Sequence, residues 1–295
     1  MRNTFISKLT EYAKINDKIV LIVGDLGFSV VEEFAQRFPQ RFINAGVAEQ
    51  NMVSLAAGMA SEGYHVFCYS IANFPTFRCA EQIRNDVAYH NFPVTIVSVG
   101  GGVAYGNLGY SHHAVQDYAL LRTMPNLTIL SPGDPNEVQS CLEYIIDNPG
   151  PSYLRLGKTG ETNFSCATNT VNDGQWNLIK KGKNSKSAIV STGTALKNAI
   201  AMSKSKHNFS SVYSLPAWSM ASKIKQVENF EQFEEIITVE DHLLDGGFGS
   251  WILEARNLLN YDDDVKIVTR FLDQTVFGTV GTQQTLEKMS ANFHY

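Results

Sequence analysis

The chain has 295 residues, of which 44% are hydrophobic and 18% charged, and its formal net charge is −5. This composition is typical of a globular protein large enough for two domains, and it excludes nucleic-acid binding through a generally basic surface. No apolar run approaches the roughly 18 residues of a membrane-spanning helix. The four cysteines include no C-x-x-C pair, so we expect a cytoplasmic protein with reduced thiols.

Short apolar runs alternate with segments of helical periodicity along the first half of the chain. Buried strands are predicted at residues 19–23, 65–69, 94–99, 127–130 and 153–156. Apolar residues at three- and four-residue spacing predict helices at 48–59 and 136–146. Strands that alternate with helices indicate an α/β fold, with a mostly parallel sheet covered on both faces.

Residues 161–186 interrupt this alternation, because they are rich in Asn, Thr, Lys and Gly and have little apolar periodicity. We predict a linker there. Strands are then expected at 188–190, 211–213, 236–239 and 265–268. The sequence therefore predicts two three-layer α/β/α domains, at residues 1–160 and 187–295.

Two segments near predicted strand ends carry candidate ligand-binding side chains, because open α/β sheets bind ligands beyond the carboxyl ends of their strands. Glu49, in the sequence Gly-Val-Ala-Glu-Gln, falls in the first turn of a predicted helix. A surface carboxylate favoured by the helix dipole is the simpler interpretation of Glu49. Phe74 and Phe77 flank a proline after the strand at 65–69. They are either core aromatics at helical spacing or a platform for a flat heteroaromatic ring.

A glycine-rich loop follows the strand at 94–99. Five of the ten residues at 100–109 are glycine, which disfavours a regular helix or strand and lets the backbone approach a ligand closely. His112 and His113 come next, and a metal site is disfavoured because no further Cys or His lies at ligand spacing. These histidines either hydrogen-bond a substrate oxygen or cap and pack the following helix.

The order of these segments resembles the transketolase family. Three stretches resemble its pyrimidine-binding domain: Gly-Val-Ala-Glu-Gln at 46–50, Phe-Pro-Thr-Phe-Arg at 74–78 and Gly-Tyr-Ser-His-His-Ala-Val-Gln-Asp at 109–117. Val-Glu-Asp-His at 239–242 and Gly-Gly-Phe-Gly at 246–249 resemble its C-terminal domain. The resemblance covers essentially the whole chain, and the joint order of the motifs makes it specific.

The resemblance implies a thiamine-diphosphate-dependent enzyme that transfers a two-carbon ketol unit between sugars or sugar phosphates. Glu49 matches the family's glutamate that binds the aminopyrimidine ring of the cofactor, where a carboxyl group can exchange a proton with a ring nitrogen. Phe74 matches the aromatic residue that stacks on this ring. Phe77 and the aliphatic Ile71 match its neighbours, and Asp25 matches an acidic residue near the same pocket.

The same resemblance implies a set of substrate-binding residues. His112 matches a histidine that contacts hydroxyls of the ketose donor, and His113 lies directly beside it. Arg155 matches an arginine that binds the terminal phosphate of the substrate through paired hydrogen bonds. Ser29 and Arg2 fall where the family has further phosphate-binding groups.

The diphosphate-binding motif of the family, Gly-Asp-Gly, is not found in this sequence. The resemblance therefore implies a partner, a transketolase N-terminal-type subunit that carries the diphosphate-binding domain and holds Mg²⁺. The present chain would share the cofactor and contribute no metal ligand. Because the cofactor of this family lies between domains of different protomers, we expect an α₂β₂ assembly around a homodimer of this chain.

Two positions depart from ordinary transketolases. Leu108 stands where the family has an acidic residue that contacts an acceptor hydroxyl, and Gly100 stands where many members have a histidine near the acceptor. The loss of both polar groups weakens the recognition of hydroxyl groups. We therefore expect a non-standard acceptor sugar.

Other interpretations remain open. The β subunit of a 2-oxo acid dehydrogenase shares an Ala-Glu-Gln motif and a similar C-terminal domain, and a deoxyxylulose-phosphate-synthase-like role is a related alternative. The stretch from His112 to Asp117 favours the transketolase branch. A copy that only binds or regulates a partner is the non-catalytic alternative, and the joint presence of Glu49, Phe74 and His112 favours catalysis.

Overall fold

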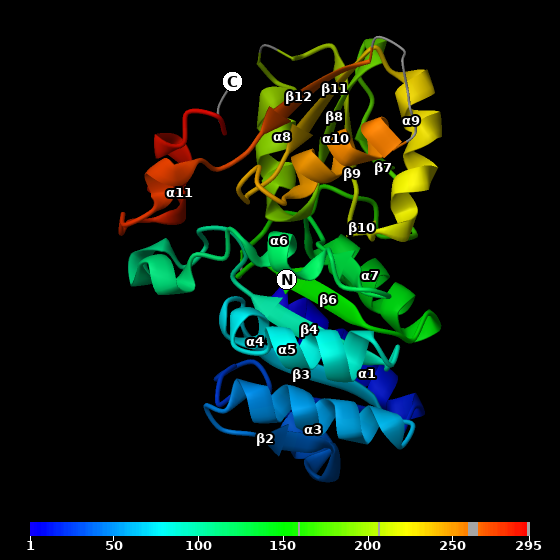
Figure 1. Ribbon diagram of the computed structural model, residues 1–295, viewed down its shortest axis with the longest axis vertical. Helices are drawn as coiled ribbons and strands as arrows, with labels where there is room; N and C mark the ends of the chain where they lie inside the picture. Colours follow the sequence, from blue (N-terminus) through cyan, green and yellow to red (C-terminus); the bar gives the residue numbers. More distant parts are fainter. Residues whose placement is uncertain (159, 206, 259–264, 294–295) are drawn as a thin grey trace.

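The computed structural model describes residues 1–158, 160–205, 207–258 and 265–293. It has two α/β units, one from each half of the chain, which lie one above the other in Figure 1. Each unit contains a mostly parallel sheet with flanking helices, which confirms the predicted fold class. None of the described helices is long and apolar enough to cross a membrane.

Seven strands form the first sheet, in the order β10-β5-β6-β4-β3-β1-β2. They are β1 (Ile19–Val23), β2 (Phe42–Asn44), β3 (His65–Ile71), β4 (Val94–Val99), β5 (Thr128–Leu130), β6 (Ser152–Leu156) and β10 (Ala217–Trp218). All neighbours pair in parallel except β10, which runs antiparallel to β5. The strands β1, β3, β4, β5 and β6 confirm the sequence prediction, whereas β2 and β10 are too short to show a periodicity.

Helices cover both faces of this sheet. On one face, α1 (Arg2–Ile15), α2 (Glu32–Arg37) and α7 (Pro135–Asp147) share an apolar cluster with the strands. On the other face, α3 (Glu49–Ser61) packs with α4 (Phe74–Phe77), α5 (Ala80–Gln82) and the π-helix η2 (Ile83–Ala88). The strand β1 is buried at every position, as expected for a strand that is covered on both faces.

Five strands form the second sheet, in the order β12-β11-β8-β9-β7. They are β7 (Asn177–Lys180), β8 (Asn184–Ser191), β9 (Ser210–Ser214), β11 (Glu235–Val239) and β12 (Lys266–Arg270). Only β7 pairs antiparallel within the described part of this sheet. The helices of this unit are α8 (Leu196–Met202), α9 (Val227–Gln232), α10 (Phe248–Leu258) and α11 (Gln283–Met289), and α6 (Asp117–Leu121) of the first unit lies against them (Figure 1).

The range predicted as a linker contains strands of the second sheet. The range 161–186 includes β7 and the start of β8, so the second sheet begins before residue 187. The strand β7 is an edge strand with only its first residue buried, and such a strand lacks the apolar pattern that predicts a buried one. In addition, β10 comes from the second half of the chain but pairs with β5 of the first sheet.

Arg155 joins the two units through buried ion pairs. It lies on β6 with 2% of its surface exposed. Its Nε is 2.7 Å from Asp117 Oδ2 in the first unit, and its Nη1 is 2.5 Å from Asp241 Oδ1, which follows β11 in the second unit. Burial by itself would raise the pKa of Asp241, but the charge of Arg155 holds that pKa below its ordinary value.

We expect Arg155→Met to destabilise the protein by about 3–5 kcal/mol, because it leaves two buried carboxylates without their cation. The measurement is the free energy of unfolding in urea. The matched control is Lys266→Met, which removes an exposed ion pair with Glu235 and should cost at most about 1 kcal/mol. Equal, small effects of the two substitutions would contradict this role of Arg155.

Candidate active site

Loops from neighbouring strands bring most of the candidate residues to one edge of the first sheet. The strands β1, β3, β4 and β6 are neighbours or near neighbours and run parallel, so their carboxyl ends lie at the same edge. The loop after β1 carries Asp25 and Ser29, the turn after β3 carries Phe74, and the loop after β4 carries His112.

Glu49 is a buried carboxylate at the first position of α3, with 4% of its surface exposed. Both of its oxygens lie 2.9 Å from Nη1 of Arg78. It borders a cavity of about 450 Å³ that residues 47–51 and Arg78 line. The structure thus supports a ligand-facing carboxylate over the simpler surface glutamate.

Arg78 also connects Glu49 to the predicted aromatic platform. Its guanidinium carbon lies 4.3 Å from the ring centroid of Phe74, a cation–π contact. A second cavity of about 330 Å³ is lined by Asn73, Phe74, Phe77, Arg78, Tyr110, Ser111, His113 and Gln116. The Phe77 side chain is half-exposed, and Ile71 ends β3 in a partly buried position. Arg78 therefore lines both cavities, one beside the Glu49 carboxylate and the other beside the rings of Phe74 and Phe77.

The two loop histidines have different environments. His112 is partly buried; its Nδ1 lies 3.0 Å from Ser111 Oγ, and its ring centroid lies 5.3 Å from that of Phe74. His113 is buried, and its carbonyl oxygen accepts a hydrogen bond from Asn73. Burial, and for His112 the neighbouring His113, lowers the pKa of both imidazoles, so both are neutral near pH 7.

Asp25 and Ser29 lie on the exposed loop after β1, and both have positive φ angles, 54° and 63°. The Asp25 carboxylate accepts a hydrogen bond from Asn44 Nδ2 at 2.9 Å. Asn44 Oδ1 in turn accepts from the N–H groups of Asp25 and Gly46 at 3.1 and 2.9 Å. These bonds tie the loop after β1 to the segment that leads into α3 and Glu49. Ser29 is exposed on the same loop.

Arg155 does not lie where the predicted phosphate contact requires it. Its guanidinium is enclosed by Asp117, Asp241 and the carbonyl oxygen of Ala114, which leaves it in the interior. Arginine at this position is a structural ion-pair partner, because its strand position points it toward the second unit rather than the site. Lys158, which lies beyond the end of the same strand, is near Tyr105 and Arg2.

Lys158, Arg2 and Tyr105 form a cationic cluster. The Lys158 ammonium lies 4.6 Å from the ring centroid of Tyr105. Burial raises the pKa of Tyr105, and the nearby charge of Arg2 opposes this shift. Arg2 Nε is buried and has no hydrogen-bond partner among the described residues. Burial, and then the charge of Arg2, lowers the pKa of Lys158. Two adjacent cations with an unused donor favour an anionic ligand.

Tyr105 also explains the glycine at position 100. A Cβ atom added to Gly100 would lie 2.1 Å from Cε2 of Tyr105, so the tyrosine ring occupies the space of a side chain there. The Tyr105 ring centroid lies 6.5 Å from that of His112. Leu108, at the end of the turn η3 (Gly106–Leu108), is 56% exposed. Gly100 and Leu108, the two positions that depart from the family, therefore lie in the same loop. The Tyr105 ring covers Gly100, whereas Leu108 is exposed.

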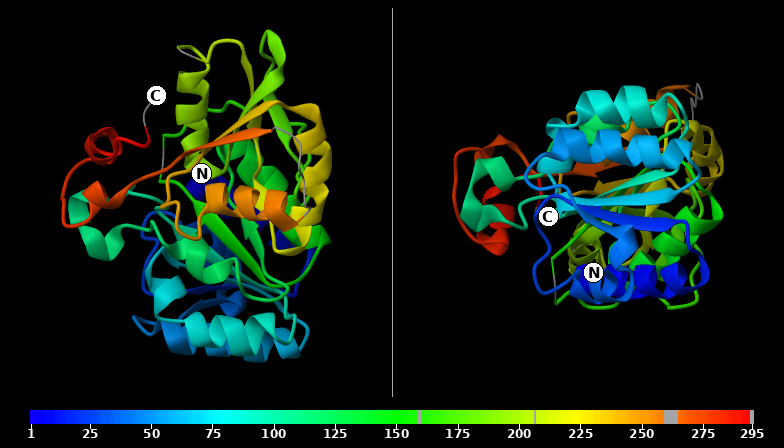
Figure 2. Two further views of the ribbon diagram at one scale, coloured as in Figure 1. Left: turned by 45° about the horizontal axis from the view of Figure 1, so that its top comes forward. Right: turned by 90° about the horizontal axis from the view of Figure 1, so that it is seen from below.

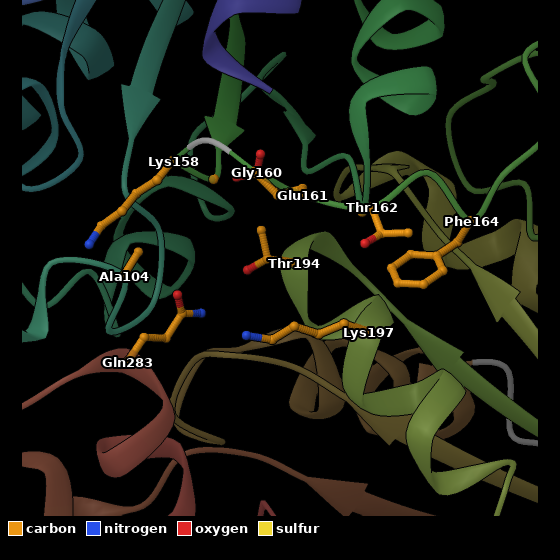
Figure 3. Close-up of a pocket in the computed structure, with 11 residues that line it drawn as sticks. Ala104, Lys158, Gly160, Glu161, Thr162, Phe164, Thr194, Lys197 and Gln283 are labelled. Atoms are coloured by element: carbon orange, nitrogen blue, oxygen red, sulfur yellow. The ribbon is translucent and has the colours of Figure 1, made fainter.

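Lys158 also borders a cavity of about 260 Å³ between the two units (Figure 3). Thr194, Lys197 and Gln283 of the second unit face it across from Lys158 and Glu161. Lys197 forms an ion pair with Glu287 at 2.9 Å. The cavity thus extends from the cationic cluster into the second unit.

Three functional candidates escape the sequence prediction: Arg78, Tyr105 and Lys158. Arg78 ends the aromatic segment and Lys158 follows the strand at 153–156, so both lie where strand-end logic places ligand-binding groups. Tyr105 gives no local signal, because its role depends on the space over Gly100. Within the described ranges, no group of three or more His, Cys, Asp or Glu residues is arranged to hold a metal ion.

Comparison with known families and proteins shows to which family the chain belongs. Residues 1–160 match the family "Transketolase, pyrimidine binding domain". A "Putative transketolase C-terminal section" from Methanocaldococcus jannaschii is 31% identical, over 98% of this chain and 90% of that protein. A subunit of the apulose-4-phosphate transketolase of Phocaeicola vulgatus is 30% identical, over 86% of this chain and 82% of that one.

A solved structure described as "Split gene transketolase, inactive beta4 tetramer" is 29% identical and superposes with a TM-score of 0.85. The match covers 98% of this chain and 92% of that chain. The chain therefore belongs to the transketolase family, in which it corresponds to the C-terminal half.

Proposed function

We propose that this chain is one subunit of a two-chain transketolase that depends on thiamine diphosphate and transfers a two-carbon ketol unit between sugars or sugar phosphates. The observation that carries the proposal is the buried Glu49 carboxylate, which borders an open cavity and is linked through Arg78 to the ring of Phe74. A carboxylate beside an aromatic platform suits a protonatable, flat heterocycle.

The residues present fit one half of the cofactor. Glu49, Phe74 and Phe77 suit its aminopyrimidine ring, while the sequence lacks the Gly-Asp-Gly motif with which the family binds the diphosphate. We therefore assign the diphosphate and Mg²⁺ to a partner chain. When bound, the cofactor supplies the carbon nucleophile for breaking and making the carbon–carbon bond.

The role of Glu49 is to hold and move a proton at a ring nitrogen. Its position at the start of α3 orients the carboxylate, and its burial keeps water from competing for it. Arg78 occupies both carboxylate oxygens, so it must release one of them when a ring nitrogen approaches. The exposed half of the Arg78 side chain gives it room to move away.

His112 and the cationic cluster would bind the two ends of the sugar. A neutral imidazole donates a hydrogen bond through one nitrogen and accepts through the other, which suits the hydroxyl groups of a ketose. Arg2 and Lys158 supply charge for a terminal phosphate or similar anion. Ser29, exposed on the loop after β1, could add a hydroxyl group to the same contact. Lys158 takes the place that the sequence prediction gave to Arg155.

We propose a partner that covers the rim of the Glu49 cavity. Val47 lines this cavity and is 73% exposed, and an apolar side chain so exposed beside a site suits a protein–protein contact. One relative is named as a transketolase subunit and another as a split-gene β4 tetramer, and both names support a split enzyme. We therefore retain the α₂β₂ assembly with a homodimer of this chain and a transketolase N-terminal-type subunit.

The decisive test is ketol transfer with thiamine diphosphate and Mg²⁺, by this chain alone and with a diphosphate-domain partner. We expect activity only in the pair, and Glu49→Gln should lower its turnover by about 10²–10⁴-fold, because the amide cannot exchange the proton. The control is Glu81→Gln, which changes an exposed carboxyl group on α5.

Three other outcomes would contradict the proposal. Full activity of this chain alone would remove the need for a partner. Decarboxylation of 2-oxo acids without ketol transfer would favour the 2-oxo acid dehydrogenase or synthase alternatives. An unchanged turnover in the Glu49→Gln pair would favour a regulatory copy.

Lys158→Met should raise the KM for phosphorylated sugars by about 10–100-fold, because it removes a charge-assisted hydrogen bond of about 1.5–3 kcal/mol. The KM for the same sugars without phosphate should change little. Lys266→Met, which removes an exposed lysine of β12 in the second sheet, is the matched control. A similar loss for both kinds of sugar would exclude a phosphate contact.

The acceptor specificity follows from Leu108 and from the Tyr105 ring over Gly100. We expect Leu108→Asp to raise kcat/KM for acceptors that carry a hydroxyl at the contacted carbon, relative to their deoxy analogues, by about 10-fold through one new hydrogen bond. Leu178→Asp places the same charge on a half-exposed position of β7 and should have no effect. An unchanged acceptor preference in Leu108→Asp would refute this explanation.

A further inference from the structure

The loop that carries His112 has little structure of its own. The loop spans residues 103–113. Its two ends are held together because Gly102 and Ala114 exchange backbone hydrogen bonds of 2.9 and 2.8 Å. Between these ends the loop forms two 3₁₀ turns, η3 and η4 (Tyr110–His112). Turns of this length rarely hold one conformation without outside contacts.

Asn73 of the first unit contributes two such contacts, because its Nδ2 donates to the carbonyl oxygens of Ser111 and His113. Further contacts come from the C-terminal segment, which we define as residues 271–293. It follows β12, contains α11 and lies beside the η3–η4 turns in Figure 1 and in both views of Figure 2. The N–H of Gly281 donates to the carbonyl oxygen of Gly106 at 3.2 Å. The ring of Phe277 meets that of Tyr110 edge-on, with centroids 5.2 Å apart.

The tightest contact joins Leu286 to Gly106. A Cβ atom added at Gly106 would lie 2.4 Å from Leu286 Cδ1 and 2.6 Å from the carbonyl oxygen of Gly281. Leu286 is fully buried and belongs to the same apolar cluster as Val103, at the start of the loop. The loop and α11 are therefore packed as parts of one core, although they belong to different units.

Gly106 is linked to His112 through successive turns. The N–H of Gly109 donates to the carbonyl oxygen of Gly106 at 3.2 Å, and the N–H of His112 donates to that of Gly109 at 2.9 Å. A displacement at Gly106 is therefore transmitted to the His112 ring, which faces Phe74.

We propose that the C-terminal segment is a positioning element of the active-site loop, in which Leu286 and Phe277 set the place of His112 without touching the substrate. Its consequence for catalysis rests on the proposed function, whereas the ordering of the loop does not. The second unit would then contribute to the chemistry, beyond covering the first unit.

Hydrogen exchange of the full chain tests the ordering. We expect Leu286→Ala to speed amide exchange in residues 104–113 by about 10-fold or more, because it removes the contact that holds the loop. Ile200→Ala, a buried position of α8 in the same apolar cluster, is the matched control and should leave the exchange of the loop unchanged. Equal exchange of the loop in wild type and Leu286→Ala would overturn the proposal.

A conservative substitution separates positioning from general stability. Gly106→Ala should displace the loop, because the new methyl group meets both Leu286 and the carbonyl oxygen of Gly281. Leu286→Met keeps an apolar side chain of similar volume, so it should retain the protection of the loop that Leu286→Ala loses. In the reconstituted pair, Gly106→Ala and Leu286→Ala should each lower kcat by about 10–100-fold, with a smaller change in KM, and Leu286→Met should retain most of the wild-type kcat.

A Leu286→Met variant with the low kcat of Leu286→Ala would overturn the proposal, as would a loss of kcat that Ile200→Ala shares. If the wild-type pair transfers no ketol unit, the proposed function fails, and the exchange of the loop in these variants still decides whether the segment orders it.

Discussion

A buried guanidinium between two carboxylates is the constraint on which both units of this protein depend. Arg155 belongs to the first sheet, Asp117 to the helix that faces the second unit, and Asp241 to the turn after β11. Because a buried charge without its partners is costly, the sheets must be placed so that all three groups meet. The same placement seats the C-terminal segment of the second unit against the loop that carries His112.

The site is organised by a second arginine, which is half-exposed and able to move. Arg78 pairs with Glu49 on one side and contacts the Phe74 ring on the other, so it occupies the two groups that we propose bind the cofactor ring. Arg155 is held on all sides, whereas Arg78 has solvent beside it. Burial thus distinguishes an arginine that fixes the fold from one that can yield its place to a ligand.

Much of the fold can be predicted from the sequence, because buried parallel strands are continuous apolar runs with turn residues at their ends. The strands β2, β7 and β10 are not predicted in this way. They are short and lie at sheet edges, so they do not form a continuous buried apolar run. In the proposed site, Glu49, Phe74 and His112 follow from motif order. The proposal of Lys158 in place of Arg155 does not, because the direction of a side chain depends on what packs over it.

Hydrophobic periodicity and motif order are local properties of the chain, so the class of fold, the family and the segments that carry the candidate chemistry can all be read from the sequence. Three features depend instead on the folded arrangement: which cations face the site, the Tyr105 ring that fills the space over Gly100, and the support that α11 gives to the loop of His112. These contacts join residues far apart in the chain, and the packing that selects them is complementary only once both units are in place.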